Sequence, residues 1–312
     1  MQSPSSLGRL RAWARAHPGT VTAAGATIVV GALAIGLWGK RGDFAAAIGG
    51  ASALVLGAAV LLQICWLLLR SEAWHVCVGA AGGHVDRPCL YRASSLGYLG
   101  NVFNASFGLA LRIAALRRSA PTDSPRPSVL VGAEVPIVVI EGALAALMSF
   151  TLIGPLGLAW WVPLVCLAVA AAVIAVMAKL GRVRKEAFWH GLAVMQGLRS
   201  RNAIIALVIL AVSAQVARNW LVLTGLGVDI SVSDAVALLI ATAALGILPA
   251  GPGLGAAAAV LILGANGTAV VAAAGALLTA TSVVGALCFA AWGLADRLLR
   301  PPAPAPAPAV AG

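Results

Sequence analysis

Residues 44–69 read FAAAIGGASALVLGAAVLLQICWLLL and contain no Asp, Glu, Lys or Arg. An apolar run of this length crosses the ~30 Å hydrocarbon core of a bilayer as a helix. The rest of the 312-residue chain has the same character, since 61% of its residues are hydrophobic and only 10% are charged, against about a quarter in soluble domains. The sequence therefore predicts an all-α, polytopic membrane helix bundle and excludes a soluble domain of this size.

The charged residues fall in blocks between the apolar runs. The chain carries 21 Lys and Arg against 10 Asp and Glu, a net charge of +11. The basic residues concentrate before residue 20 and in residues 70–126, 179–201 and 297–300. Basic blocks that alternate with apolar stretches are typical of cytoplasmic loops. No basic stripe is interleaved with exposed aromatics, so we predict no nucleic-acid partner.

The apolar runs predict a multi-pass protein of the bacterial plasma membrane with about seven or eight spans and both termini in the cytoplasm. We expect a basic cytoplasmic N-terminus (1–19), a transmembrane domain (20–296) and a disordered Pro/Ala-rich cytoplasmic tail (297–312). Ser233 is the predicted N-cap of the helix that follows it. The apolar helices are placed at residues 20–38, 44–69, 129–153, 158–178, 203–226, 235–248 and 268–292, with a short piece at 256–263 that either crosses alone or pairs as a hairpin.

Two segments are more polar than the predicted spans but still carry many apolar residues. Residues 91–118 read YRASSLGYLGNVFNASFGLALRIAALRR, which is too polar for a lipid-facing span and too apolar for a plain loop. Residues 248–255, LPAGPGLG, lie between two short apolar stretches. Irregular backbone at membrane depth persists only where protein shields it or water reaches it, as in the broken helices of transporters. The alternative is a Gly/Pro kink together with an interfacial amphipathic helix.

Residues 70–118 resemble the N-terminal signature of the flippase-like family typified by the transmembrane region of bacterial lysylphosphatidylglycerol synthetases. The family's Pro-rich second break is similar to residues 248–255, and its preceding outer turn resembles residues 223–231. The ordered set covers residues 55–296. The resemblance implies a flippase-like fold in which Arg112 is the retained basic residue of the first break and contacts lipid phosphate.

The chain departs from the family pattern at its acids. Where the first break usually carries Pro and then an acidic residue, this chain has Asn104 and Leu109, and residues 256–259 replace a Glu after the second break. An acidic motif early in the third span is kept only as Glu134. The synthetase domain has no counterpart here, so we expect no tRNA-dependent lipid aminoacylation by this chain.

Charged residues inside predicted spans are the strongest functional candidates. Glu134 and Glu141 are seven residues apart and hence on one helix face, and Gln215, Arg218 and Asn219 share another face. Their depths predict that Glu141 meets Arg218, either as a static packing pair or as the centre of a polar cavity for a lipid head group. The candidate lipid-binding residues are Asn101, Asn104, Arg112, Glu134, Glu141, Gln215, Arg218, Asn219, Pro249, Gly251, Pro252, Gly253 and Gly255.

Other chemistries have weak support in the sequence. His75, Cys77, His84 and Cys89 fit no standard zinc spacing, so we predict no metal site, and no cofactor motif is present. Without a cluster of acid, base and nucleophile, we predict no catalytic residues and no enzyme. The predicted function is a flippase-like lipid transporter that moves or binds a phospholipid or polyprenyl-linked lipid. The alternative is a non-transporting scaffold or accessory protein of cell-envelope lipid metabolism; protein partners cannot be inferred.

Overall fold

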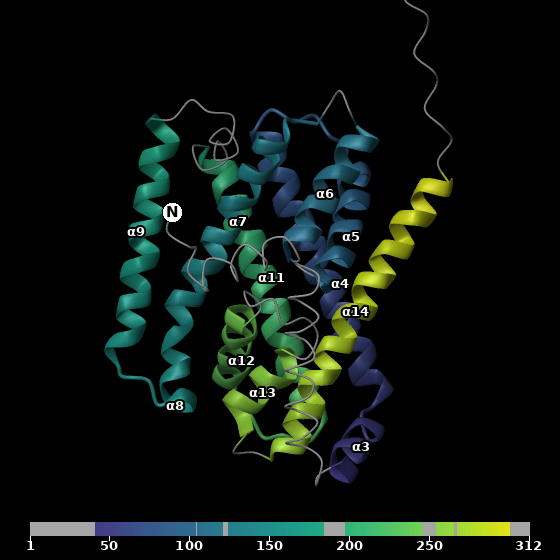
Figure 1. The fold of residues 1–312 in the computed structure, drawn as a ribbon, viewed down its shortest axis with the longest axis vertical. Coiled ribbons are helices and arrows are strands. Elements are labelled where there is room, and N and C mark those ends of the chain that lie inside the picture. The colour runs from purple at the N-terminus through teal and green to yellow at the C-terminus, as the bar shows by residue number, and fades with distance from the viewer. Residues whose placement is uncertain are drawn as a thin grey trace, which may run out of the picture.

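The computed structural model describes residues 41–103, 105–120, 124–183, 197–245, 254–264 and 267–299, and every regular element in these ranges is a helix (Figure 1). In chain order the elements are α3 (Arg41–Gly49), α4 (Ala53–Ala80), α5 (Arg87–Phe103), α6 (Ala105–Ser119), α7 (Pro127–Met148), the short η2 (Ser149–Leu152) and α8 (Ile153–Leu156), α9 (Trp161–Val183), α11 (Leu198–Gly225), α12 (Val232–Leu245), α13 (Leu254–Leu263) and α14 (Thr268–Leu299). The expected all-α class is confirmed.

Four helices are long and apolar enough to cross a membrane: Ala53–Ala80, Pro127–Leu156, Arg199–Gly225 and Thr268–Leu299. Large apolar side chains also cover much of the outer surface; on α9, for example, Leu164, Val169 and Val176 are each about half exposed or more. Such contiguous apolar surface is rare on soluble monomers and is compatible with a protein embedded in a bilayer. The number of spans stays a prediction.

The second predicted span is wrong at both of its boundaries. The chain forms the short α3 up to Gly49, takes an extended conformation at Ser52 (φ −63°, ψ 131°) and starts α4 only at Ala53. α4 then continues past Arg70 to Ala80. The prediction ended the span at Arg70 because an arginine commonly marks the end of a membrane helix, whereas here acids from another helix neutralise Arg70 inside the bundle.

The first interrupted segment folds as two helices that pack along each other, α5 and α6. Glycines make this close approach possible: a Cβ on Gly108 would lie 2.5 Å from the carbonyl oxygen of Gly97, and a Cβ on Gly100 would lie 2.8 Å from the Cα of Gly108. A side chain at either position would push the helices apart. Close backbone contact therefore holds α5 and α6 together as a pair.

A second pair of short helices, α12 and α13, lies toward the opposite end of the molecule from α5 and α6 (Figure 1). α13 packs against α14 through small residues, because a Cβ on Gly275 would lie 2.5 Å from both Gly255 O and Ala256 Cα. The residues between α12 and α13 are outside the described ranges. The two interrupted segments thus contribute one helix pair to each half of the bundle.

The N-cap of α12 is Ser231 and not the predicted Ser233. The backbone N–H of Asp234 donates to Ser231 Oγ (3.3 Å), and the backbone N–H of Ser231 donates to the carboxylate of Asp234 (2.9 Å). This reciprocal pair satisfies two backbone donors at the helix start. Ser233 was predicted because the helix was expected to begin at Ala235, whereas α12 begins at Val232.

Candidate functional site

Four charged side chains from α4, α6 and α7 form one continuous network. Glu134 on α7 accepts hydrogen bonds from Arg70 Nη2 (2.8 Å) and from Arg112 Nη1 (3.0 Å), one at each carboxylate oxygen. Arg70 Nη1 also donates to Glu141, so the order is Arg112, Glu134, Arg70, Glu141. Two cations and two acids give this network no net charge, which is how ion pairs become tolerable in an apolar bundle.

The spacing of the two acids on α7 allows both of them to bind the guanidinium of Arg70. Glu134 and Glu141 lie on one face of α7, as predicted, since both reach the same guanidinium. The predicted pairing of Glu141 with Arg218 is wrong, because Arg70 occupies that position. Depth along a helix does not say which helix stands opposite α7.

Arg112 is the most buried member of the network, with only 4% of its surface exposed. Its guanidinium stacks over the Trp74 ring at 3.7 Å from the ring centroid, and its Nε donates to Ser94 Oγ at 3.1 Å. A cation over an indole face in a desolvated site contributes about 2 kcal/mol. Within the described part of the chain, Arg112 Nη2 is buried without a hydrogen-bond partner, as is Trp74 Nε1.

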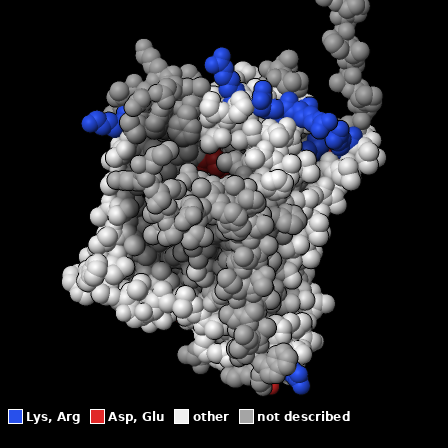
Figure 2. Space-filling model, viewed as in Figure 1, with Lys and Arg blue, Asp and Glu red and all other residues white. Residues whose placement is uncertain are grey.

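Exposure increases along the network. The side chains of Arg112, Glu134, Arg70 and Glu141 are 5%, 14%, 16% and 29% exposed, respectively. Figure 2 shows an acidic group at the base of a hollow on one face, below the Lys and Arg that gather near the upper end. The network is thus anchored at Arg112 and accessible at Glu141.

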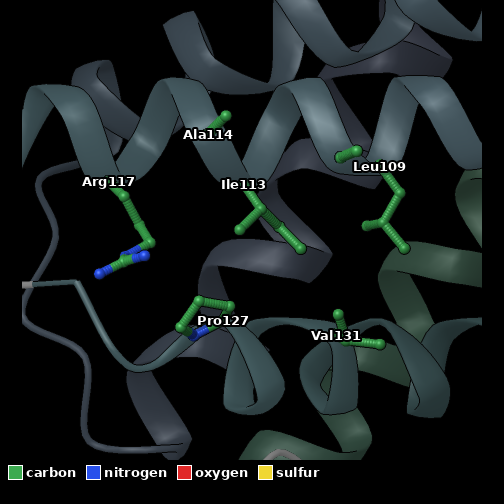
Figure 3. A pocket seen from close by; sticks show the side chains of 7 residues that line it. Leu109, Ile113, Ala114, Arg117, Pro127 and Val131 are labelled. Carbon is green, nitrogen blue, oxygen red and sulfur yellow. The ribbon is translucent and has the colours of Figure 1, made fainter.

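A groove of about 570 Å³ lies between α6 and α7, the helices that carry Arg112 and Glu134, although no residue of the network lines it (Figure 3). Its lining is apolar except at one end, where the Arg117 side chain lies near Pro127. Ile113 in the groove follows Arg112 in sequence, and Val131 precedes Glu134 by three residues. The lining residues are Leu109, Ala110, Ile113, Ala114, Arg117, Pro127 and Val131. An apolar groove with one cation at its end is suited to an amphipathic ligand.

A second polar cluster lies between α4, α11 and α14. The predicted polar face of α11 is confirmed: Gln215, Arg218 and Asn219 are 8%, 7% and 3% exposed. Gln215 Nε2 donates to Gln63 Oε1 (2.9 Å), and Arg218 Nη1 donates to the same oxygen and to Ser282 Oγ (2.9 Å). Asn219 Nδ2 lies 3.5 Å from the Ala235 carbonyl of α12. The partners of Arg218 are therefore neutral acceptors.

Two further predicted residues, Asn101 and Gly255, take no part in either cluster. Asn101 is exposed in the last turn of α5, and Gly255 packs against α14. The first segment's other asparagine and four residues of the second break lie outside the described ranges, namely Asn104, Pro249, Gly251, Pro252 and Gly253.

Sequence reasoning missed Arg70, Trp74 and Gln63, although α4 carried a signal. Arg70 is four residues before Trp74 and seven after Gln63, so the three share a helix face that becomes evident once the helix is extended beyond residue 69. Because the predicted span ended at residue 69, this shared face was not recognised.

Comparison of the chain with protein-family models, with curated proteins and with solved structures finds no match to any of them. The resemblance to the flippase-like family therefore stays a prediction.

Proposed function

We propose that the protein binds an anionic phospholipid or polyprenyl-linked lipid by its head group and moves that head group between the two leaflets. The observation that carries the proposal is Nη2 of the buried Arg112, which has no hydrogen-bond partner among the described residues and belongs to a helix that also lines an apolar groove. A lipid phosphate supplies the missing acceptor, and the acyl chain lies in the groove between α6 and α7. Arg112 would then exchange part of its contact with Glu134 for contact with the phosphate.

The arrangement of charge supports a route for the head group. The network is neutral when no ligand is bound, so a bound phosphate gives it a net negative charge. The phosphate oxygens then compete with the two carboxylates for Arg70 and Arg112. Because Glu141 is partly exposed, it provides a polar path for the head group out of the buried end of the network. Transport requires such a graded polar surface, because a head group cannot cross hydrocarbon unaided.

We propose further that the basic upper end in Figure 2 faces the cytoplasm, in keeping with the excess of Lys and Arg in cytoplasmic loops. Arg117 at the end of the groove lies on the same helix as Arg112 and would meet phosphates of the inner leaflet. The lipid would then bind from the cytoplasmic leaflet, in a bacterial plasma membrane.

One observation favours the alternative of a non-transporting scaffold. Each acid of the network already has an arginine partner, and a closed set of ion pairs can simply fix the packing of α4, α6 and α7. The two functions differ in what happens to a lipid, so transport can be measured directly.

The test is transfer of a fluorescent head-group-labelled phosphatidylglycerol across proteoliposomes that contain the full chain, followed by quenching of the outer leaflet. Arg112→Gln removes the buried cation and should slow transfer about tenfold, the value of one charged hydrogen bond of ~1.5 kcal/mol. Arg199→Gln is the matched control, because Arg199 is exposed near the start of α11 and makes none of the ion pairs of the network. Its transfer rate should equal that of the wild type.

Transfer no faster than in protein-free liposomes would reject the transport proposal and leave the scaffold. Equal slowing by both variants would show that the effect comes from total charge and not from the Arg112 site.

A further inference from the structure

Arg218 is a buried cation whose charge no acid neutralises in the described part of the chain. Its hydrogen bonds start at Nη1 and end on Gln63 and Ser282, which are neutral, and its Nε is buried with no hydrogen-bond partner among the described residues. The arginines of the first network, by contrast, each bind at least one carboxylate. An uncompensated charge inside a bundle costs several kcal/mol unless a counter-charge is bound.

The Arg218 cluster is separate from the first network but lies along the same face of α4. Gln63 and Arg70 are two helical turns apart on α4, which places the two clusters about 10 Å from each other along one helix face. Arg218 is seven residues from the end of α11, so it lies in the half of the bundle that also holds α12 and α13. The second cluster is therefore a distinct polar site at a different depth.

We propose that Arg218 is the centre of a second binding site, which takes a phosphate-type oxyanion. The donors around it suit such a ligand: the guanidinium retains its Nε, and the amide groups of Gln215 and Asn219 each carry a second N–H beyond the one that binds Gln63 or Ala235. The Ser282 hydroxyl donates to the Leu278 carbonyl and is not one of these donors. Oxyanions are recognised by planar guanidinium groups assisted by neutral hydrogen-bond donors. The bound anion supplies the charge that the fold leaves missing, whether or not the protein transports lipid.

The oxyanion has two possible sources, a free phosphate ion and the phosphate of a lipid head group. Both present the same oxygens to Arg218, so they differ only in whether acyl chains contribute. The experiment therefore uses three probes in detergent with the full chain: inorganic phosphate at constant ionic strength against chloride, dihexanoyl phosphatidylglycerol, and dihexanoylglycerol, which has the chains without the phosphate.

The measurement is the unfolding temperature Tm of the purified protein. A ligand at ~100 times its Kd should raise the Tm by at least about 3 °C. We expect a rise with phosphatidylglycerol and none with dihexanoylglycerol. If inorganic phosphate also raises the Tm, the site accepts the free ion; if it does not, the site is specific for the lipid head group.

Arg218→Met provides the decisive contrast. Without ligand this variant should have a higher Tm than the wild type, because an apolar side chain of similar length removes the unpaired charge. In an Arg112→Gln background, which removes the first proposed lipid site, Arg218→Met should also abolish the Tm rise with ligand, whereas Arg199→Gln keeps it. Arg218→Lys retains the positive charge but lacks the planar guanidinium group. It should bind labelled dihexanoyl phosphatidylglycerol about tenfold more weakly in equilibrium dialysis.

Two results would overturn the proposal. One is a wild-type protein in which neither phosphate probe raises the Tm. The other is a ligand-induced Tm rise, or binding of labelled lipid in dialysis, that is unchanged when Arg218 is replaced by either Met or Lys.

Discussion

Glu134→Gln removes the one acid that both Arg70 and Arg112 share. Its carboxylate accepts from Arg70 at 2.8 Å and from Arg112 at 3.0 Å, one arginine at each oxygen. An amide has a single oxygen, so its NH₂ group must face the second guanidinium, donor against donor. One charged hydrogen bond is lost outright and Arg112 is left without an anionic partner, whereas Arg70 keeps Glu141.

Breaking a buried ion pair by removing one partner costs about 3–5 kcal/mol, and Glu134 is buried enough for that range to apply. The assay is reversible unfolding in mixed micelles by added SDS, followed by circular dichroism. Glu72→Gln is the matched control, since Glu72 pairs with Arg87, whose side chain is 66% exposed, and the new amide can still accept from Tyr91. Its cost should be ~1 kcal/mol or less.

Replacing Arg112 as well should recover part of the loss. In Glu134→Gln with Arg112→Met the unpaired cation is gone, so the double variant should be more stable than the sum of the two single effects predicts, by about 2 kcal/mol. Equal losses from Glu134→Gln and Glu72→Gln, or strict additivity in the double variant, would refute the idea that Glu134 is the shared counter-charge.

Three further changes test the surroundings of the site. Gly108→Ala should destabilise the protein by about 1–3 kcal/mol through its clash with Gly97, whereas Gly142→Ala, where nothing lies within 4 Å of the new Cβ, should stabilise α7 by up to ~1 kcal/mol; the same SDS titration should give these opposite signs. Trp74→Leu should cost about 3 kcal/mol because it removes both a buried indole and the cation–π contact with Arg112, and Trp74→Phe should recover part of that loss by the same titration. Ser231→Ala should speed hydrogen exchange in the first turn of α12 about fivefold, for a cap worth ~1 kcal/mol, while Ser233→Ala leaves that exchange rate unchanged.

Most helices follow from local sequence. The predicted helices at residues 203–226 and 129–153 correspond to α11 and to α7 with its short extension, because long apolar runs between charges allow one interpretation. The two interrupted segments also emerged from composition alone, since Gly, Asn and Ser concentrate there. Boundaries were less certain, as α4 shows, because a span that carries a neutralised arginine does not end at that residue.

The candidate site divides in the same way. Residue spacing alone predicts that Glu134 and Glu141 share a face, that Gln215, Arg218 and Asn219 share another, and that such groups need partners in an apolar bundle. Their partners became known from the packed helices: Arg70 for the two acids, and neutral Gln63 and Ser282 for Arg218. The physical reason is that helical periodicity fixes direction and depth on one helix, whereas pairing depends on which helices pack side by side. Small residues help to decide this: Gly225 and Gly285 allow α11 and α14 to approach Val55 and Gln63 of α4 closely.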